Sequence, residues 1–269
     1  MCLPSGYYKS FNNCIFERCA GSVSASNAFC SVIRCGGNII RVIIRNCVGN
    51  RGAATAKATY LTNCIVENIR TLNAATVFEE TRFYNCIVRN INNGNQSLTT
   101  YSADIKQCLF YNLSKKNRLF SSCRGNFYGN TVILPTAVTA EIITWNTNSK
   151  LYVANNIFNT GQIRAISASP EIIVVNNYCR NAFGDATRIS GNVLNTNLDP
   201  GFIDAVNENF RLLSSSPCIS AGSYEWLDSY YSKRDLDKNL YKNPPSIGVY
   251  QFDYLKEIIP NEEYPLGTI

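Results

Sequence analysis

The sequence predicts an all-β fold, a solenoid whose coils of about 22 residues form a parallel β-helix. Three observations support this prediction. One segment recurs three times in a row, as ATYLTNCIVENIR, TRFYNCIVRNIN and ADIKQCLFYNLS. Short β-branched runs that end near glycine or asparagine, such as CSVIRC and NIIRVIIRNC, are typical of strands. A helical period of useful length is not found.

The cysteines set the step of this repeat. Cys64, Cys86 and Cys108 follow one another at intervals of 22 residues, and their neighbours keep the same interval. Four further columns of equivalent residues result: Leu61, Phe83, Ile105; Ile65, Ile87, Leu109; Val66, Val88, Phe110; and Asn68, Asn90, Asn112. Such a period indicates units that each bury an apolar face only against the next unit.

Asparagine precedes the repeat cysteine in most coils. It does so at Asn13, Asn46, Asn63 and Asn85, and Gln107 is the exception. An asparagine side chain tolerates the left-handed backbone of a tight bend and can hydrogen-bond to its copy in the next coil. We therefore expect these residues to be architectural, forming a ladder along the solenoid.

The chain has 12 cysteines and no histidine. Cys14, Cys64, Cys86 and Cys108 share one repeat position beside apolar residues, which indicates small buried side chains stacked in the interior. We expect free thiols rather than disulfides. Zinc is disfavoured because histidine is absent.

The sequence leaves two alternatives for the residue after each repeat cysteine, whose side chain points either outward or into the core. If strict alternation resumes after the bend, then Ile15, Ile65, Ile87 and Leu109 form an apolar column on the outside. Alternatively, the bend resets the alternation and these residues belong to the core. An external column would mark a surface covered by another chain or by long loops.

The end of the solenoid carries a second pattern, DPGFIDAVNENFRLLSSSPCISAG at 199–222 and RDLDKNLYKNPPSIGVYQF at 234–252. It resembles the closing segment of right-handed parallel β-helix proteins of the pectin-lyase-like superfamily, particularly bacterial surface and phage-associated members. The matching residues are Asp199, Pro200, Phe202, Asp204, Phe210, Leu212, Ser216, Pro217, Ile219, Gly222, Ile247, Gly248 and Tyr250. Lys238, Asn239 and Gln251 depart from it.

The resemblance implies three parts: coils at 1–198, a capping segment at 199–252 and a tail at 253–269. We expect the apolar side chains of Phe202, Phe210, Leu212 and Ile219 to cover the last coil. The superfamily includes lyases, hydrolases, tailspikes and non-catalytic adhesins, so the resemblance specifies the fold and leaves the activity open.

Two outward columns hold the candidate site residues. Tyr60, Arg82 and Asp104 form one column, and Glu67, Arg89 and Tyr111 form the other. Tyrosine offers a flat face to a sugar, while arginine and carboxylate bind hydroxyl or acid groups, so both columns are candidate carbohydrate subsites. The alternative is that the charged residues are ion pairs between coils.

Other sites and partners receive less support from the sequence. Asp235 and Asp237 are weak calcium candidates, and no other cofactor is expected. The net charge of +6 comes from scattered residues, which disfavours nucleic acid as a partner. Membrane spans are not expected, because no apolar run approaches 18 residues. The start also lacks the features of a signal peptide, so the chain either stays in a cytosol or has lost its true N-terminus.

Three functions remain open. The first is a non-catalytic protein of a phage virion or bacterial cell surface that binds a polysaccharide, a cell-surface glycan or another receptor. The second is a lyase or glycoside hydrolase for an acidic polysaccharide, with its site in the loops at 50–56, 92–100 and 134–150. The third is a structural rod that forms a homotrimer or a larger assembly.

Overall fold

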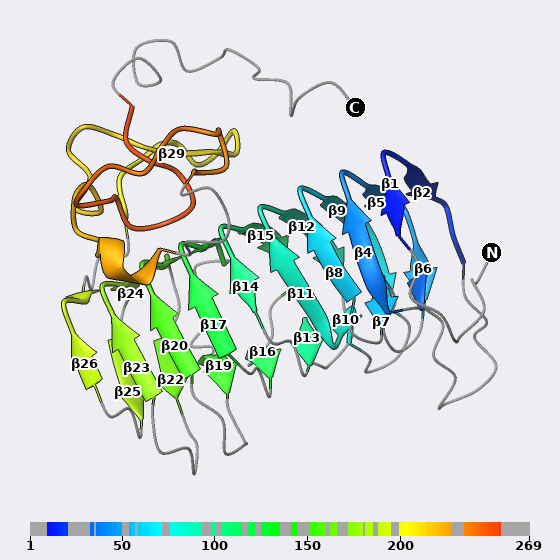
Figure 1. Cartoon of the computed structure of the whole chain (residues 1–269), viewed down its shortest axis with the longest axis horizontal. Coiled ribbons are helices and arrows are strands. Elements are labelled where there is room, and N and C mark those ends of the chain that lie inside the picture. The colour runs from blue at the N-terminus through cyan, green and yellow to red at the C-terminus, as the bar shows by residue number, and fades with distance from the viewer. Residues whose placement is uncertain are drawn as a thin grey trace.

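The computed structural model shows a solenoid whose coils lie side by side along one axis (Figure 1). The residues that it describes are 10–20, 33–34, 36–49, 54–56, 59–71, 76–92, 98–100, 104–114, 118–121, 125–134, 141–144, 151–159, 162–165, 172–179, 181–184, 188–194, 199–227 and 234–253. The loops predicted for an enzyme site fall largely outside these residues, as does the tail after Asp253.

Each coil adds one strand to each of three parallel sheets. Sheet A consists of β1 (Phe11–Asn12), β4 (Gly37–Ile40), β8 (Thr59–Thr62), β11 (Thr81–Tyr84), β14 (Ile105–Lys106), β17 (Gly125–Tyr128), β20 (Leu151–Ala154), β23 (Ile172–Val175) and β26 (Arg188–Ser190). Its registers pair Phe83 with Leu61 and with Ile105, so the predicted 22-residue step is confirmed.

Sheets B and C complete the coil. Sheet B consists of β2 (Ile15–Glu17), β5 (Ile43–Arg45), β9 (Ile65–Thr71), β12 (Ile87–Asn92), β15 (Leu109–Leu113), β18 (Thr131–Val132), β21 (Ile157–Phe158), β24 (Tyr178–Cys179) and β27 (Val193–Leu194), with β6 (Val48–Gly49) paired to β9. Sheet C consists of β3 (Ile33–Arg34), β7 (Thr55–Ala56), β10 (Phe78–Glu79), β13 (Thr99–Thr100), β16 (Arg118–Ser121), β19 (Glu141–Thr144), β22 (Gln162–Ala165) and β25 (Asn181–Gly184).

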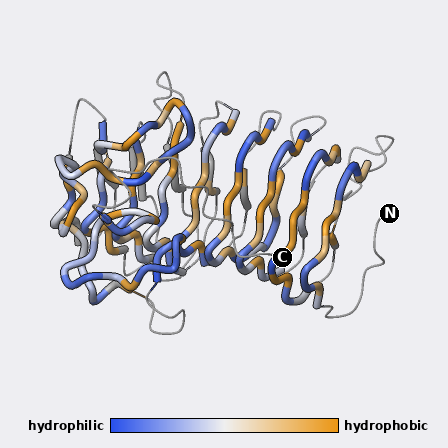
Figure 2. The backbone as a smooth tube through the Cα atoms, turned by 90° about the horizontal axis from the view of Figure 1, so that it is seen from above, coloured by the Kyte–Doolittle hydropathy of each residue, from blue (hydrophilic) through white to orange (hydrophobic). Residues whose placement is uncertain are grey.

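The interior is filled by apolar side chains. In Figure 2, hydrophobic stretches of the chain recur at the same place in successive coils. Phenylalanine rings form a continuous series of contacts through the middle of the solenoid. The centroid of Phe110 lies 6.0 Å from that of Phe83 and 5.3 Å from that of Phe120. Because each ring touches the next coil, the coils are coupled along the axis by buried aromatic area.

Two turns of the coil place a residue at positive φ, the first turn in all nine described coils and the second turn in the first five. The turn between sheets A and B does so at Asn13, Arg41, Asn63, Asn85, Gln107, Gly129, Asn155, Asn176 and Gly191. A second turn, within the sheet B side, does so at Arg18, Asn46, Asn68, Asn90 and Asn112. Asparagine predominates because it tolerates left-handed backbone better than most residues, so its predicted role in the bends is confirmed.

The predicted placement of Asn46 and Cys47 is wrong. Arg45 pairs with Glu67, which puts Asn46 beside Asn68 in the second turn and Cys47 level with Ile69. Asn68 donates from Nδ2 to Oδ1 of Asn46 at 3.0 Å, and Asn112 donates to Asn90 at 3.1 Å. In these N-terminal coils the asparagine–asparagine hydrogen bonds therefore lie at the second turn, one turn later than the sequence predicts.

The cysteine column continues as an asparagine column in the second half of the solenoid. The residue after the first turn is Cys64, Cys86 and Cys108, and then Asn130, Asn156, Asn177 and Asn192. Oδ1 of Asn156 accepts hydrogen bonds from both nitrogens of Asn130, and Nδ2 of Asn156 donates to the Phe127 carbonyl at 2.8 Å. This inner ladder was not predicted.

Eight cysteines within the described residues are free thiols, as predicted: Cys14, Cys19, Cys47, Cys64, Cys86, Cys108, Cys179 and Cys218. Cys2, Cys30, Cys35 and Cys123 lie outside those residues. Cys86 Sγ lies 3.4 Å from the Leu61 carbonyl and 3.3 Å from the Tyr84 carbonyl, so this buried thiol has acceptors for its proton. The column therefore combines small apolar volume with weak hydrogen bonding.

The capping segment at 199–252 folds back along the outer side of sheet B (Figure 1). It contains an antiparallel pair, β28 (Phe202–Asp204) with β29 (Asn209–Leu212), and a 3-10 turn, η1 (Tyr224–Trp226). Phe202, Phe210 and Leu212 share an apolar cluster with residues of β15, β21 and β24. The cap thus covers a flank of several coils, whereas the sequence predicted that it covers the last coil.

The column at Ile15, Ile65, Ile87 and Leu109 lies outside the solenoid core, which decides between the two alternatives. Leu109 belongs to the cluster formed with the cap, separate from the interior cluster that contains its neighbours Cys108 and Phe110. Ile87 packs at the edge of the cap cluster, and Ile15 is 51% exposed. The outward alternation therefore resumes directly after the bend, and the cap covers one half of the column.

Candidate functional site

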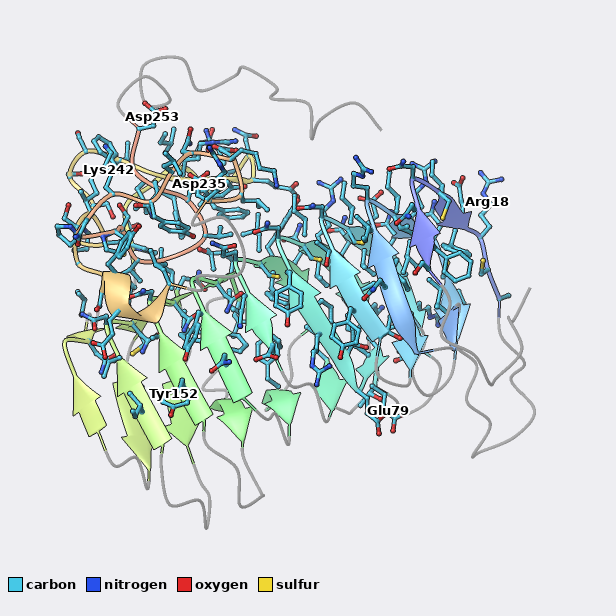
Figure 3. The ribbon with its side chains drawn as sticks, viewed as in Figure 1. Arg18, Glu79, Tyr152, Asp235, Lys242 and Asp253 are labelled. Atoms are coloured by element: carbon cyan, nitrogen blue, oxygen red, sulfur yellow. The ribbon has the colours of Figure 1, made fainter. Side chains whose placement is uncertain are left out.

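The first predicted column is the centre of a polar row on the outer face of sheet A. Strands β8, β11 and β14 place Tyr60, Arg82 and Asp104 at successive coils, and the row continues to Asn126 and Tyr152. Neighbouring coils are about 4.8 Å apart when strands stack in a sheet. Figure 3 labels Tyr152, which lies on the same sheet towards the C-terminal coils.

Contacts between coils fix the side chains of this row. The guanidinium carbon of Arg82 lies 4.6 Å from the Tyr60 ring centroid, and Arg82 also donates to the Tyr60 hydroxyl. On the other side, Arg82 Nε is 3.7 Å from Asp104 Oδ2. Asp104 Oδ1 accepts from Asn126 Nδ2 at 3.0 Å. The predicted ion pair is present, and it belongs to a connected row that spans at least four coils.

A second row runs beside the first on sheet A. Lys106 Nζ lies 5.7 Å from the Tyr84 ring and 5.9 Å from the Tyr128 ring, so the ammonium sits between two tyrosines one coil away on either side. Lys106 Nζ is also 4.0 Å from Asp104 Oδ1, which joins the two rows. Tyr84 and Lys106 are largely buried, and Tyr128 is half-buried. The two rows together carry rings, cations and a carboxylate on one face.

The second predicted column, on sheet B, is drawn into the cap. Arg89 is 2.7 Å from Glu67 through Nη2 and donates from Nη1 to the Tyr111 hydroxyl at 2.8 Å. Tyr111 donates to Glu208 of the cap at 2.9 Å, and its ring centroid is 5.1 Å from that of Phe210. Since Tyr111 is only 3% exposed, its ring faces the cap rather than solvent.

Burial changes the electrostatics of this sheet B cluster. Burial raises the pKa of the Tyr111 hydroxyl to about 12, although the hydrogen bond from Arg89 opposes the rise. Burial also tends to lower the pKa of the Arg89 guanidinium, but its hydrogen bonds to Tyr111 and Glu67 raise that pKa overall. Arg89 is therefore a fixed positive charge that ties the cap to the coils.

The two weak calcium candidates have other partners in the cap. Asp237 accepts a bidentate pair from Arg211, at 2.6 and 2.7 Å. Asp235 is fully buried and accepts from the backbone nitrogens of Asn239 at 2.7 Å and Gln251 at 2.9 Å. Within the described residues, no cluster of three acidic or sulfur ligands is suited to hold a metal ion. Both aspartates thus contribute to the internal structure of the cap.

Sequence reasoning found the row at Tyr60, Arg82 and Asp104 but missed Tyr84, Lys106, Asn126 and Tyr128. The signal was available: each missed residue lies two positions after a row member or one coil away from it. The repeat loosens after Ser114, where asparagine replaces cysteine, and this hid the register of Asn126 and Tyr128. The role of the six predicted residues in carbohydrate binding stays a prediction.

The comparisons with known proteins add no family to this description. The chain matches no protein-family model and no curated protein. The parallel β-helix is therefore established by its strands and registers, and the resemblance of the capping segment to the pectin-lyase-like superfamily stays a prediction. Within the part of the chain that the structure describes, no helix has the length and hydropathy needed to cross a membrane.

Proposed function

We propose that this chain is a non-catalytic binding protein that holds an extended polysaccharide or cell-surface glycan along the outer face of sheet A. The row Tyr60–Arg82–Asp104–Asn126 carries the proposal, because it repeats polar and aromatic groups at the spacing of the coils. A glycan is itself a repeating polymer, so each successive sugar unit meets one polar or aromatic side chain of the row. Several weak contacts then add along one chain.

The chemistry of the row suits sugars. Tyrosine rings bind the apolar face of a pyranose, while the hydroxyl of Tyr60 and the amide of Asn126 exchange hydrogen bonds with sugar hydroxyls. Arg82 provides a partly exposed cation, which favours glycans that carry carboxylate or phosphate groups. The contacts among these residues hold them in place before binding, which lowers the entropy cost of association.

The proposed biological setting is a phage virion or a bacterial cell surface. Its support is the resemblance of the capping segment to surface and phage-associated members of the pectin-lyase-like superfamily, together with the free thiols of the described residues. Free thiols persist best in a chain that folds in a reducing compartment. This favours a particle assembled in a cytosol.

The test is a binding screen against purified bacterial surface polysaccharides, with a turnover assay run on the same samples. We expect binding to at least one anionic polysaccharide without release of shorter or unsaturated products. Arg82→Ala should weaken that binding about tenfold, the effect of losing one charge-assisted contact. Lys242→Ala is the matched control, since it removes an exposed cation from the cap.

The screen also separates the rival functions. Catalytic turnover of the bound polysaccharide would favour the lyase or hydrolase and contradict a purely binding role. Failure to bind any polysaccharide, with a stable trimer in solution, would favour the structural rod.

A further inference from the structure

Half of the outer apolar column on sheet B is not covered by the described residues of the cap. Registers place Ile15, Ile43 and Ile65 at successive coils, each pointing away from the interior. Ile15 is 51% exposed, and Ile43 and Ile65 are half-buried. Three isoleucines in line on one outer face make an apolar strip of the kind that normally has an occupant.

This strip is continuous with the interface that the cap already forms. The same column is covered by the cap at Leu109 and Ile157. Two polar contacts join the cap to the coils next to the strip. Lys238 donates to Asn63 at 3.1 Å, and Glu208 lies 3.5 Å from Arg89. In Figure 1 the described part of the cap lies above β15 to β24, and the described chain does not extend above β2 and β5.

The borders of the strip are basic. The exposed charged side chains on these coils are Glu17, Arg18, Arg41 and Arg70, and the exposed Lys238 of the cap reaches Asn63. The nearby acids are engaged with arginines, because Glu17 is 3.2 Å from Arg45 and Glu67 is 2.7 Å from Arg89. An occupant of the strip should therefore combine apolar side chains with negative charge.

We propose that residues 254–269 of this chain, YLKEIIPNEEYPLGTI, occupy the strip and extend the cap over β9, β5 and β2. The segment holds apolar side chains such as Ile258 and Ile259 and the acids Glu257, Glu262 and Glu263. It starts beside Phe252, which packs at the edge of the cap cluster.

The segment is long enough to reach the strip. Its 16 residues span up to roughly 50 Å when extended. Six coils separate Ile157, under the cap, from Ile15, which corresponds to about 29 Å along the axis. This proposal does not depend on glycan binding, because the strip lies on sheet B and the proposed glycan-binding row lies on sheet A.

Site-specific photo-crosslinking of the full chain tests the proposal. The photoreactive residue p-benzoyl-phenylalanine replaces Ile65 in one variant and Ile43 in a second, so that one folding failure does not end the test. A matched variant carries it at Tyr60, on sheet A. We expect crosslinks within one chain from positions 43 and 65 into peptides of 254–269, and none from position 60.

Charge reversal tests the attraction between the basic borders of the strip and the acids of residues 254–269. Replacing Glu257, Glu262 and Glu263 together by lysine should reduce the crosslinks from position 65 to the level of the Tyr60 control, because the strip and the segment then repel. Glu225→Lys, an exposed reversal in the cap, should leave them unchanged. Crosslinks between two chains, or none into 254–269 from a folded variant, would overturn the proposal.

Discussion

The backbone nitrogen of Cys108 donates a hydrogen bond to Oδ1 of Asn130, one coil further along, at 2.9 Å. This contact marks the place where the inner cysteine column becomes an asparagine ladder. On one side a thiol fills the position with little polarity. On the other side the Asn130 amide satisfies two backbone groups of the preceding coil and donates to the side chain of Asn156 in the next coil. The same position in the coil is therefore filled by a cysteine thiol in the earlier coils and by an asparagine amide in the later ones.

Asn156→Ala should destabilise the protein by about 2–4 kcal/mol, because it leaves buried partners of the ladder without hydrogen bonds and opens a small cavity. Asn156 is fully buried, and its amide bonds to Asn130, Asn177 and the Phe127 carbonyl. Chemical denaturation measures the loss. Asn92→Ala, at an exposed position, is the control and should change the free energy of unfolding by less than about 0.5 kcal/mol. Equal effects at both positions would contradict the ladder.

The interior thiols should resist alkylation in the native protein. Burial raises the pKa of the Cys179 and Cys218 thiols to about 12, and burial also raises that of Cys86. Since the thiolate is the reactive form, these residues should label only after unfolding, whereas the partly exposed Cys14 and Cys19 label first. Mass spectrometry after timed iodoacetamide treatment distinguishes the two groups. Rapid native labelling of Cys86 would show that its position is not interior.

The stability of the cap should depend on pH through Asp235. Burial raises the pKa of its carboxyl to about 6, against the opposing hydrogen bonds from Gln251 and Asn239. A raised pKa favours folding below the unfolded-state value, and this contribution is lost as the pH rises through about 6. Between pH 4 and 7 the wild type should therefore lose about 1–3 kcal/mol relative to Asp235→Asn. A constant difference between the two proteins across this range would contradict the assignment.

The predictable part of the fold was the part with strict sequence periodicity. Cys64, Cys86 and Cys108 set the register of three coils, and the structure pairs their neighbours as that register requires. Asn46 was misplaced because its coil has Arg41 and Val42 where the next two coils have the pairs Asn63–Cys64 and Asn85–Cys86. A local Asn–Cys match was therefore followed instead of the strand register.

The candidate site was predictable only where neighbouring residues share one strand face. Arg82 and Asp104 could be placed together from the 22-residue step alone. The covering of Tyr111 by Glu208 and Phe210 could not, because these cap residues are about 100 positions away in sequence and no periodicity relates them to the coil. The position of the cap along the outer side of sheet B also depends on contacts between residues far apart in sequence, so periodicity could not predict it.

The most direct test of the proposed glycan-binding face compares Arg82 and Arg89, the two arginines that the sequence predicts as carbohydrate-binding residues. Arg82 lies on the outer face of sheet A between Tyr60 and Asp104, and Arg89 is held on sheet B by Glu67, Tyr111 and the cap residue Glu208. For a polysaccharide that the wild type binds, titration calorimetry should show about tenfold weaker binding for Arg82→Ala. Arg89→Ala should keep the wild-type affinity while lowering the stability of the fold. The opposite result, with Arg89→Ala losing binding and Arg82→Ala retaining it, would contradict the placement of the binding face on sheet A.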